Sequence, residues 1–196
     1  MPEDIYLQAQ SIAIDTEAMG LNNFRDRLCV IQLSDGLGQA HVVHFPQANY
    51  ACPNLRKLLS NPNIIKIFHF ARFDVAIIQH YLKIEINNIY CTKIASKLCR
   101  TYTDQHSLKD LCNEVLGIKI SKQCRTSDWG ASILTQDQID YAASDVLYLH
   151  KIKQRLDEML TREGRTALAN SCFQFIPARV KLDLSGWLEA DIFSHI

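Results

Sequence analysis

The sequence contains little glycine and proline, with 7 glycines and 5 prolines among its 196 residues. Long disordered linkers are rich in such residues, so we expect no long linker in this chain. No apolar run approaches the roughly 20 residues that span a bilayer. The N-terminal residues also lack the basic and apolar regions of a signal peptide. We therefore expect a cytoplasmic protein with a single folded domain over 1–196.

Several binding motifs are also missing. The 7 cysteines form no C-x-x-C pair, so we interpret them as free thiols in a reducing compartment rather than as zinc ligands. No G-x-G-x-x-G segment or P-loop follows a predicted strand, which argues against a Rossmann-type cofactor module. The 21 basic and 21 acidic residues balance, which counts mildly against non-specific binding of nucleic acid unless bound cations reverse the charge of a cleft.

Hydrophobic patterning favours the α/β class. Short apolar segments predict strands, and segments with apolar residues at helical spacing predict helices. The expected strands are 11–14, 28–33, 39–45 and 64–70, of which the first three are antiparallel because their connections are short. The expected helices cover 53–59, Phe73 onward, 91–100, 107–116 and 162–174.

The clearest helix begins near Thr135. Thr135 and Gln138 match the T-x-x-Q capping box, in which each side chain bonds to the backbone of the other residue. Apolar residues then recur at helical spacing, which predicts that the helix continues through Leu160. Trp129 is expected to anchor the loop that precedes this helix.

Acidic residues stand at the points where these elements meet. Asp15 and Glu17 follow an apolar strand two residues apart, so both side chains point to the same face. Two carboxylates beside a core strand repel each other and lose hydration, unless a cation lies between them. A strand that ends in solvent is the plain structural alternative.

Two further acids lie on predicted helices. Asp74 stands at a helix start, where the helix dipole alone favours an acid. Tyr141 and Asp145 are four residues apart and share one helix face, as many surface pairs do. Together with Asp15 and Glu17, the acids form an oxygen-only ligand set that suits Mg²⁺ or Mn²⁺. Two such ions about 4 Å apart stabilise the attacking and leaving oxygens of a phosphodiester displacement.

Three segments resemble, in order, the three motifs of the DEDDy exonuclease superfamily. They are Asp15-Thr-Glu17, Phe68-His-Phe-Ala-Arg-Phe-Asp74 and Tyr141-Ala-Ala-Ser-Asp145. Four segments between them look like the ribonuclease D branch, namely Arg27–Leu33, Thr92–Ser96, Ser107–Leu111 and Ser127–Trp129. The resemblance covers a motif-bearing core of about 10–160, followed by a helical extension of about 161–196.

The resemblance implies an RNase H-like fold with a mixed five-stranded sheet flanked by helices. It also implies a 3′–5′ exoribonuclease that uses two divalent cations, Mg²⁺ or Mn²⁺, and releases nucleoside 5′-monophosphates from the 3′ end of single-stranded RNA. By this resemblance Asp15 bridges both metals, Glu17 and Asp145 complete one site, and Asp74 holds the other metal. Tyr141 positions the nucleophile, and a phenol pKa lowered by the metals would let it take a proton.

Substrate contacts are expected around the same motifs. The residues assigned to substrate binding are Met19, Gly20, Leu21, His69, Phe73 and Lys122. Additional candidates for phosphate contacts are Arg25, Arg27, Lys119 and Arg125. Related enzymes often have Asn four residues before the second-motif aspartate, where this chain has Phe70. With 196 residues, we expect a short, single-domain member without the C-terminal helical domains of ribonuclease D.

Two alternatives remain open from the sequence. A 3′–5′ DNA exonuclease would use the same carboxylates, because discrimination of the 2′-hydroxyl depends on a few contacts. A catalytically silent RNA-binding adaptor would keep the fold, but it has no need for Asp15, Glu17, Asp74, Tyr141 and Asp145 together.

Overall fold

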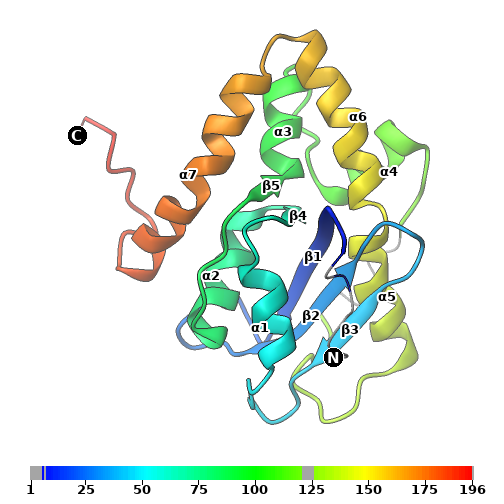
Figure 1. The fold of residues 1–196 in the computed structure, drawn as a ribbon, viewed down its shortest axis with the longest axis vertical. Coiled ribbons are helices and arrows are strands. Elements are labelled where there is room, and N and C mark those ends of the chain that lie inside the picture. Colours follow the sequence, from blue (N-terminus) through cyan, green and yellow to red (C-terminus); the bar gives the residue numbers. More distant parts are fainter. Residues whose placement is uncertain (1–5, 7, 121–125, 196) are drawn as a thin grey trace.

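A five-stranded mixed sheet forms the centre of the computed structural model, which describes residues 6, 8–120 and 126–195 (Figure 1). Its strand order is β3-β2-β1-β4-β5. The strands are β1 (Ser11–Ala18), β2 (Leu28–Ser34), β3 (His41–His44), β4 (Ile65–Phe68) and β5 (Ile89–Cys91). The first three pair antiparallel, as predicted, whereas β4 and β5 continue the sheet in parallel with β1. The central strand β1 is therefore supported on both edges.

Seven helices surround this sheet in the described part of the chain. They are α1 (Pro53–Ser60), α2 (Ala71–Leu82), α3 (Thr92–Cys99), α4 (Leu108–Leu116), α5 (Gln136–Leu147), α6 (Leu149–Arg162) and α7 (Thr166–Leu184). Helix α5 packs against β1, β2 and β3, whereas α2 packs against β2, β4 and β5. None of the described helices has both the length and the apolar character needed to cross a membrane.

The structure differs from the predicted elements at several boundaries. Strand β1 extends to Ala18, so Asp15 and Glu17 lie within the strand rather than after it. The helix that begins after Thr135 stops at Leu147, and α6 starts at Leu149, because Tyr148 interrupts the helical bonding between them. Strand β5 was not predicted, and its last residue, Cys91, was assigned instead to the start of the helix 91–100. A strand of this length has too short a pattern to identify without its partner β4.

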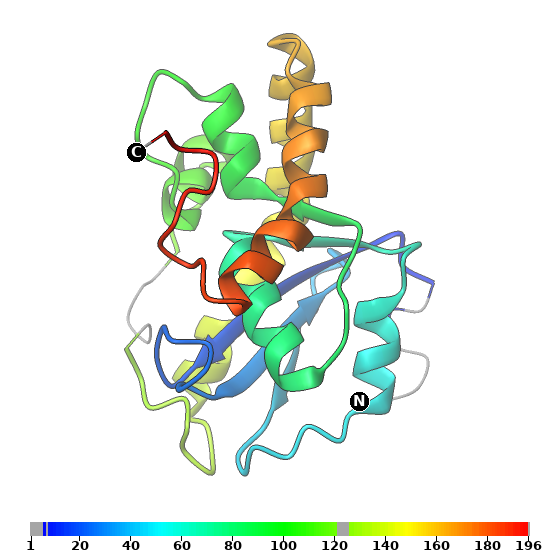
Figure 2. The ribbon, with the colours of Figure 1, turned by 90° about the vertical axis from the view of Figure 1, so that its left-hand side faces the viewer.

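Helix α7 is longer than predicted and contains Pro177 in its interior. An interior proline costs a helix about 3 kcal/mol. Burial of residues such as Phe173, Ile176 and Val180 offsets this cost, because α7 packs along α2, α3 and α6. The adjacent position of α2 and α7 is visible in Figure 2, where the C-terminal segment continues on the same side of the molecule.

A buried carboxylate joins the end of α7 to the start of α2. Asp183 is 2% exposed and accepts hydrogen bonds of 2.6 and 2.8 Å from Arg72, and of 2.6 and 3.0 Å from Arg179. Such paired, charge-assisted bonds fix geometry well. Because Arg72 lies two residues before Asp74, this contact also holds the first turn of α2 in place.

The capping box at the start of α5 should contribute to the stability of the protein. Thr135 Oγ1 accepts a 3.3 Å bond from the Gln138 backbone N–H, and Gln138 Oε1 accepts a 2.9 Å bond from the Thr135 N–H. We predict that Thr135→Ala lowers the free energy of unfolding by about 1 kcal/mol, as the loss of an N-cap does. Thr135→Ser keeps the hydroxyl and should lose little. Urea denaturation of both variants measures the difference, and equal losses would contradict the cap's role.

Candidate active site

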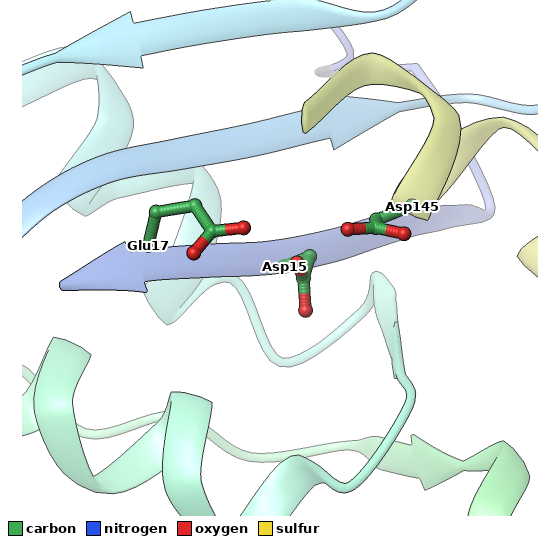
Figure 3. Close-up of side chains that lie close together, drawn as sticks. All are labelled: Asp15, Glu17 and Asp145. Carbon is green, nitrogen blue, oxygen red and sulfur yellow. The ribbon is translucent and has the colours of Figure 1, made fainter. Parts of the chain in front are cut away.

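Strand β1 and helix α5 bring three carboxylates together. Asp15 and Glu17 project from the same face of β1, and Asp145 reaches them from α5 (Figure 3). One carboxylate oxygen of each residue lies within 4.8 Å of the others. Asp145 is buried, whereas Asp15 and Glu17 are half-buried. This is the convergence that the spacing of these residues indicated.

Asp74 reaches the same region from the first turn of α2. It is 4% exposed, and its Oδ1 accepts a 2.6 Å hydrogen bond from the hydroxyl of Thr16. Thr16 lies between Asp15 and Glu17 on β1, so this bond fixes Asp74 beside the cluster rather than inside it. The charge of Asp74 is near enough to contribute to the raised pKa of Asp15.

The cluster opposes its own ionisation. Burial raises the pKa of Asp15 well above its usual value, and the charges of Asp74, Asp145 and Glu17 raise it further. Burial also raises the pKa of Asp74 to about 7, against the opposing effect of its bond with Thr16. Carboxylates held together at this cost bind hard divalent cations well, since a bound cation removes their repulsion. The donor set is all oxygen, which fits Mg²⁺ or Mn²⁺.

Gln32 is a residue beside the cluster that the sequence did not single out. It stands directly across from Asp15 in the antiparallel pair of β1 and β2. It is fully buried, and neither its amide nitrogen nor its amide oxygen has a hydrogen-bond partner among the described residues. A buried amide of this kind calls for a polar partner, so the region beside Asp15 is more polar than the apolar run 28–33 suggested.

Tyr141 lies one helical turn before Asp145 and lines the same cavity. Its ring packs against Trp129, which is 3% exposed, with 6.1 Å between ring centroids. Trp129 thus anchors the loop before α5, as expected. The protein's own groups act against the lowered phenol pKa predicted for Tyr141. Burial raises that pKa, and the charges of Asp145, Glu17 and Asp15 raise it further.

A cavity of about 300 Å³ opens over the carboxylates. Several of its lining residues were not predicted, namely Phe70, Lys93, Ser107, Leu108, Lys109 and Ile120. In the described part of the chain, neither Lys93 nor Lys109 forms an ion pair. These two lysines thus place cationic charge near the acidic cluster. A signal existed in the sequence, because both lie in segments that resemble the ribonuclease D branch.

His69 lines the cavity, but the protein uses part of its hydrogen-bonding capacity. Its Nδ1 lies 2.9 Å from the hydroxyl of Thr92. Burial is the main cause that lowers the pKa of His69 to about 3, so the ring is neutral. Phe73, in contrast, does not line the cavity and packs against the hydrophobic core. The predicted substrate contact of His69 fits its position at the cavity, whereas Phe73 lies outside the lining and its predicted contact stays a prediction.

The segment after β1 presents Met19 and Leu21 to solvent, at 59% and 85% exposure. A β-carbon at Gly20, between them, would lie 2.2 Å from the Asp26 carboxylate, so a larger residue there would displace that side chain. These residues are not among those that line the cavity. They are, however, free to meet a substrate that extends beyond it.

The basic candidates for phosphate contacts have mixed outcomes. Arg25 pairs with Asp26 at 2.6 Å. Arg27 is not free either, since it donates to the carbonyls of Phe45, Pro46 and Gly130. Lys119 is exposed, and it does not line the cavity. The predicted contacts at Lys122 and Arg125 lie outside the described residues.

Comparison with known proteins supports one family. A family model described as a 3′–5′ exonuclease matches residues 4–161. Ribonuclease D of Gluconacetobacter diazotrophicus is 34% identical over 154 residues, which cover 79% of this chain and 39% of that relative. The chain thus spans about two fifths of the length of the curated relatives it matches.

Solved structures with similar sequences cover the whole chain. Brucella melitensis NrnC with bound Mg²⁺ is 51% identical, with a TM-score of 0.95 over 100% of this chain and 96% of the other. Brucella melitensis NrnC bound to pGG is 52% identical, with a TM-score of 0.97 over 100% and 95%. These similarities confirm the predicted α/β fold of the RNase H-like exonucleases.

The raised pKa of Asp74 predicts how stability depends on pH. The folded protein holds a proton on Asp74 up to about pH 7, whereas the unfolded chain releases it near pH 3.8. The metal-free protein should therefore lose stability as the pH rises through this window. Asp74→Asn still accepts the bond from Thr16 but cannot titrate, so its stability should fall less. Urea denaturation of both proteins in EDTA across this window measures the effect, and identical pH dependence would contradict it.

Proposed function

This chain belongs to the 3′–5′ exonuclease family, and we propose that it is a two-metal 3′–5′ exoribonuclease that releases nucleoside 5′-monophosphates. The observation that carries the proposal is the convergence of Asp15, Glu17 and Asp145 within 4.8 Å at a cavity. Asp74 stands beside them on α2 and completes the set of four acids. The ribonuclease D name of the relatives and the Mg²⁺ in the similar structure support the same conclusion.

The four carboxylates would hold the cations, with Asp15 between Glu17 and Asp145 on one side and Asp74 on the other. Bound divalent cations compensate the charge that develops on the phosphate and lower the pKa of an attacking water. Rigid placement of the ligands on β1, α2 and α5 means that little reorganisation is needed when they bind. Burial and the nearby carboxylates favour the neutral phenol of Tyr141 in the metal-free protein, and we assign this residue the role of orienting the nucleophile by hydrogen bonding.

We propose single-stranded RNA as the substrate. The similar structure of Brucella melitensis NrnC bound to pGG supports RNA as the substrate. In this chain, Lys93 and Lys109 line the cavity without ion-pair partners among the described residues, so their charges are available to phosphates. Met19 and Leu21 offer exposed apolar surface to a nucleotide that extends further.

The reaction is tested with matched RNA and DNA oligonucleotides labelled at either end. We expect Mg²⁺ or Mn²⁺ to support stepwise loss of nucleoside 5′-monophosphates from RNA 3′ ends, and EDTA to stop it. Faster digestion of the DNA would favour the alternative, a 3′–5′ DNA exonuclease. RNA binding without cleavage in either metal would favour the silent adaptor.

Substitutions at the site separate metal binding from orientation of the nucleophile. Asp15→Ala or Asp145→Ala should abolish cleavage and weaken Mn²⁺ binding while the circular dichroism spectrum stays that of the wild type. Tyr141→Phe should lower kcat by about 10²-fold, within the range for a lost proton or hydrogen-bond contact, with Mn²⁺ binding unchanged. Wild-type cleavage by either aspartate variant would refute the metal assignment.

A further inference from the structure

The backbone between β4 and α2 adopts a conformation that its side chain disfavours. Phe70 has φ 71° and ψ 48°, which is the left-handed region, and it occupies the N-cap position of α2 without a side-chain cap. A residue with a β-carbon loses free energy there, and glycine, asparagine or aspartate fit such a turn better. Strained residues that persist at the edge of a site suggest a functional reason for the side chain.

Burial does not supply that reason for Phe70. Phe70 is 47% exposed, although Phe68 and Ala71 close to it in the chain are fully buried. The turn itself requires only the left-handed backbone. Related exonucleases often have asparagine at this position, which makes such a turn at lower cost. The phenyl ring thus adds something that neither the turn nor the core needs.

The ring lies at the wall of the carboxylate cavity. Phe70 lines the same cavity as Asp15, Glu17 and Asp145. The ammonium of Lys93, at the start of α3, stands 4.6 Å from the centroid of the ring. Lys93 has no carboxylate partner in the described part of the chain. An exposed aromatic ring and an unneutralised cation are thus placed together beside the acids.

We propose that Phe70 is a substrate-binding residue whose ring stacks on a nucleobase of the RNA, while Lys93 contacts a phosphate of the same strand. This inference rests on the proposed exonuclease function. Aromatic rings bind bases of any sequence by stacking, and a nearby cation adds an electrostatic contact to the backbone. The left-handed turn then serves to aim the ring, since a regular strand or helix residue at position 70 would direct the side chain elsewhere.

The first experiment compares side chains of different chemistry at position 70. Phe70→Trp retains an aromatic face, and Phe70→Leu retains apolar bulk without one. For short 5′-phosphorylated RNA we expect Phe70→Leu to raise KM about tenfold, as the loss of one base–aromatic stack does, with kcat nearly unchanged. Phe70→Trp should stay within about threefold of the wild type.

The second experiment removes the base instead of the ring. Two oligonucleotides are made in which either the 3′-terminal or the penultimate nucleotide is abasic. If the ring stacks on a base, one of these substrates lacks that base. The wild type and Phe70→Leu should then have the same KM for it, because neither enzyme can form the stack. A tenfold penalty that persists on both abasic substrates would show that the ring has a packing role only, and would overturn the inference.

Lys83 provides a matched control for the backbone. It is also left-handed, with φ 52° and ψ 48°, but it ends α2 rather than starting it and does not line the cavity. Phe70→Gly and Lys83→Gly each place glycine at a left-handed position and so remove the backbone strain there. If the backbone conformation at a helix end affected activity, both variants would show the effect. We expect only Phe70→Gly to raise KM, and an equal rise in both would overturn the inference. Failure of the wild type to cleave RNA would instead reject the proposed function.

Discussion

Mutual repulsion among partly buried carboxylates is the constraint on which the rest of this structure depends. Asp15, Glu17 and Asp145 approach within 4.8 Å, and Asp74 lies close enough to raise the pKa of Asp15. Such a cluster opposes folding until a cation compensates it. The framework must therefore hold each acid by contacts that do not depend on the cluster itself.

Each acid is held in this way. Asp15 and Glu17 stand on the central strand, which has β2 on one side and β4 on the other. Asp145 is carried by α5, whose first turn is fixed by a capping box and whose inner face packs against β1 to β3. Asp74 is held by Thr16, and its helix is joined to α7 through Arg72 and Asp183. These contacts supply stability away from the site, so the carboxylates are preorganised for divalent cations.

The wall of the cavity includes a residue with a strained backbone. Phe70 accepts a left-handed backbone while its ring stays exposed beside the acids. Lys93 and Lys109, which come from α3 and α4, bring positive charge to a chain whose formal net charge is zero. The net charge of the whole chain therefore does not predict whether this cavity can bind phosphates, because the local charge of these two lysines matters there. Tyr141 also lines the cavity, and its ring packs against that of Trp129.

Features that depend on local chain geometry could be predicted from the amino-acid sequence. The two-residue period of a strand places Asp15 and Glu17 on one face, and the four-residue spacing of a helix places Tyr141 beside Asp145. The Thr135 and Gln138 capping box is equally local. The motif order indicated that these acids meet, and the structure brings Asp15, Glu17 and Asp145 together.

Other features depend on which distant segments meet in the folded chain, and the sequence pattern did not predict them. The strand character of β5 and the burial of the Gln32 amide beside β1 each depend on neighbours far along the chain. Burial and nearby carboxylates raise the pKa of Tyr141 in the metal-free protein, whereas the expected lowering depends on bound cations and stays a prediction. Spacing determines which residues share a face, whereas desolvation and non-local contacts determine how those residues behave.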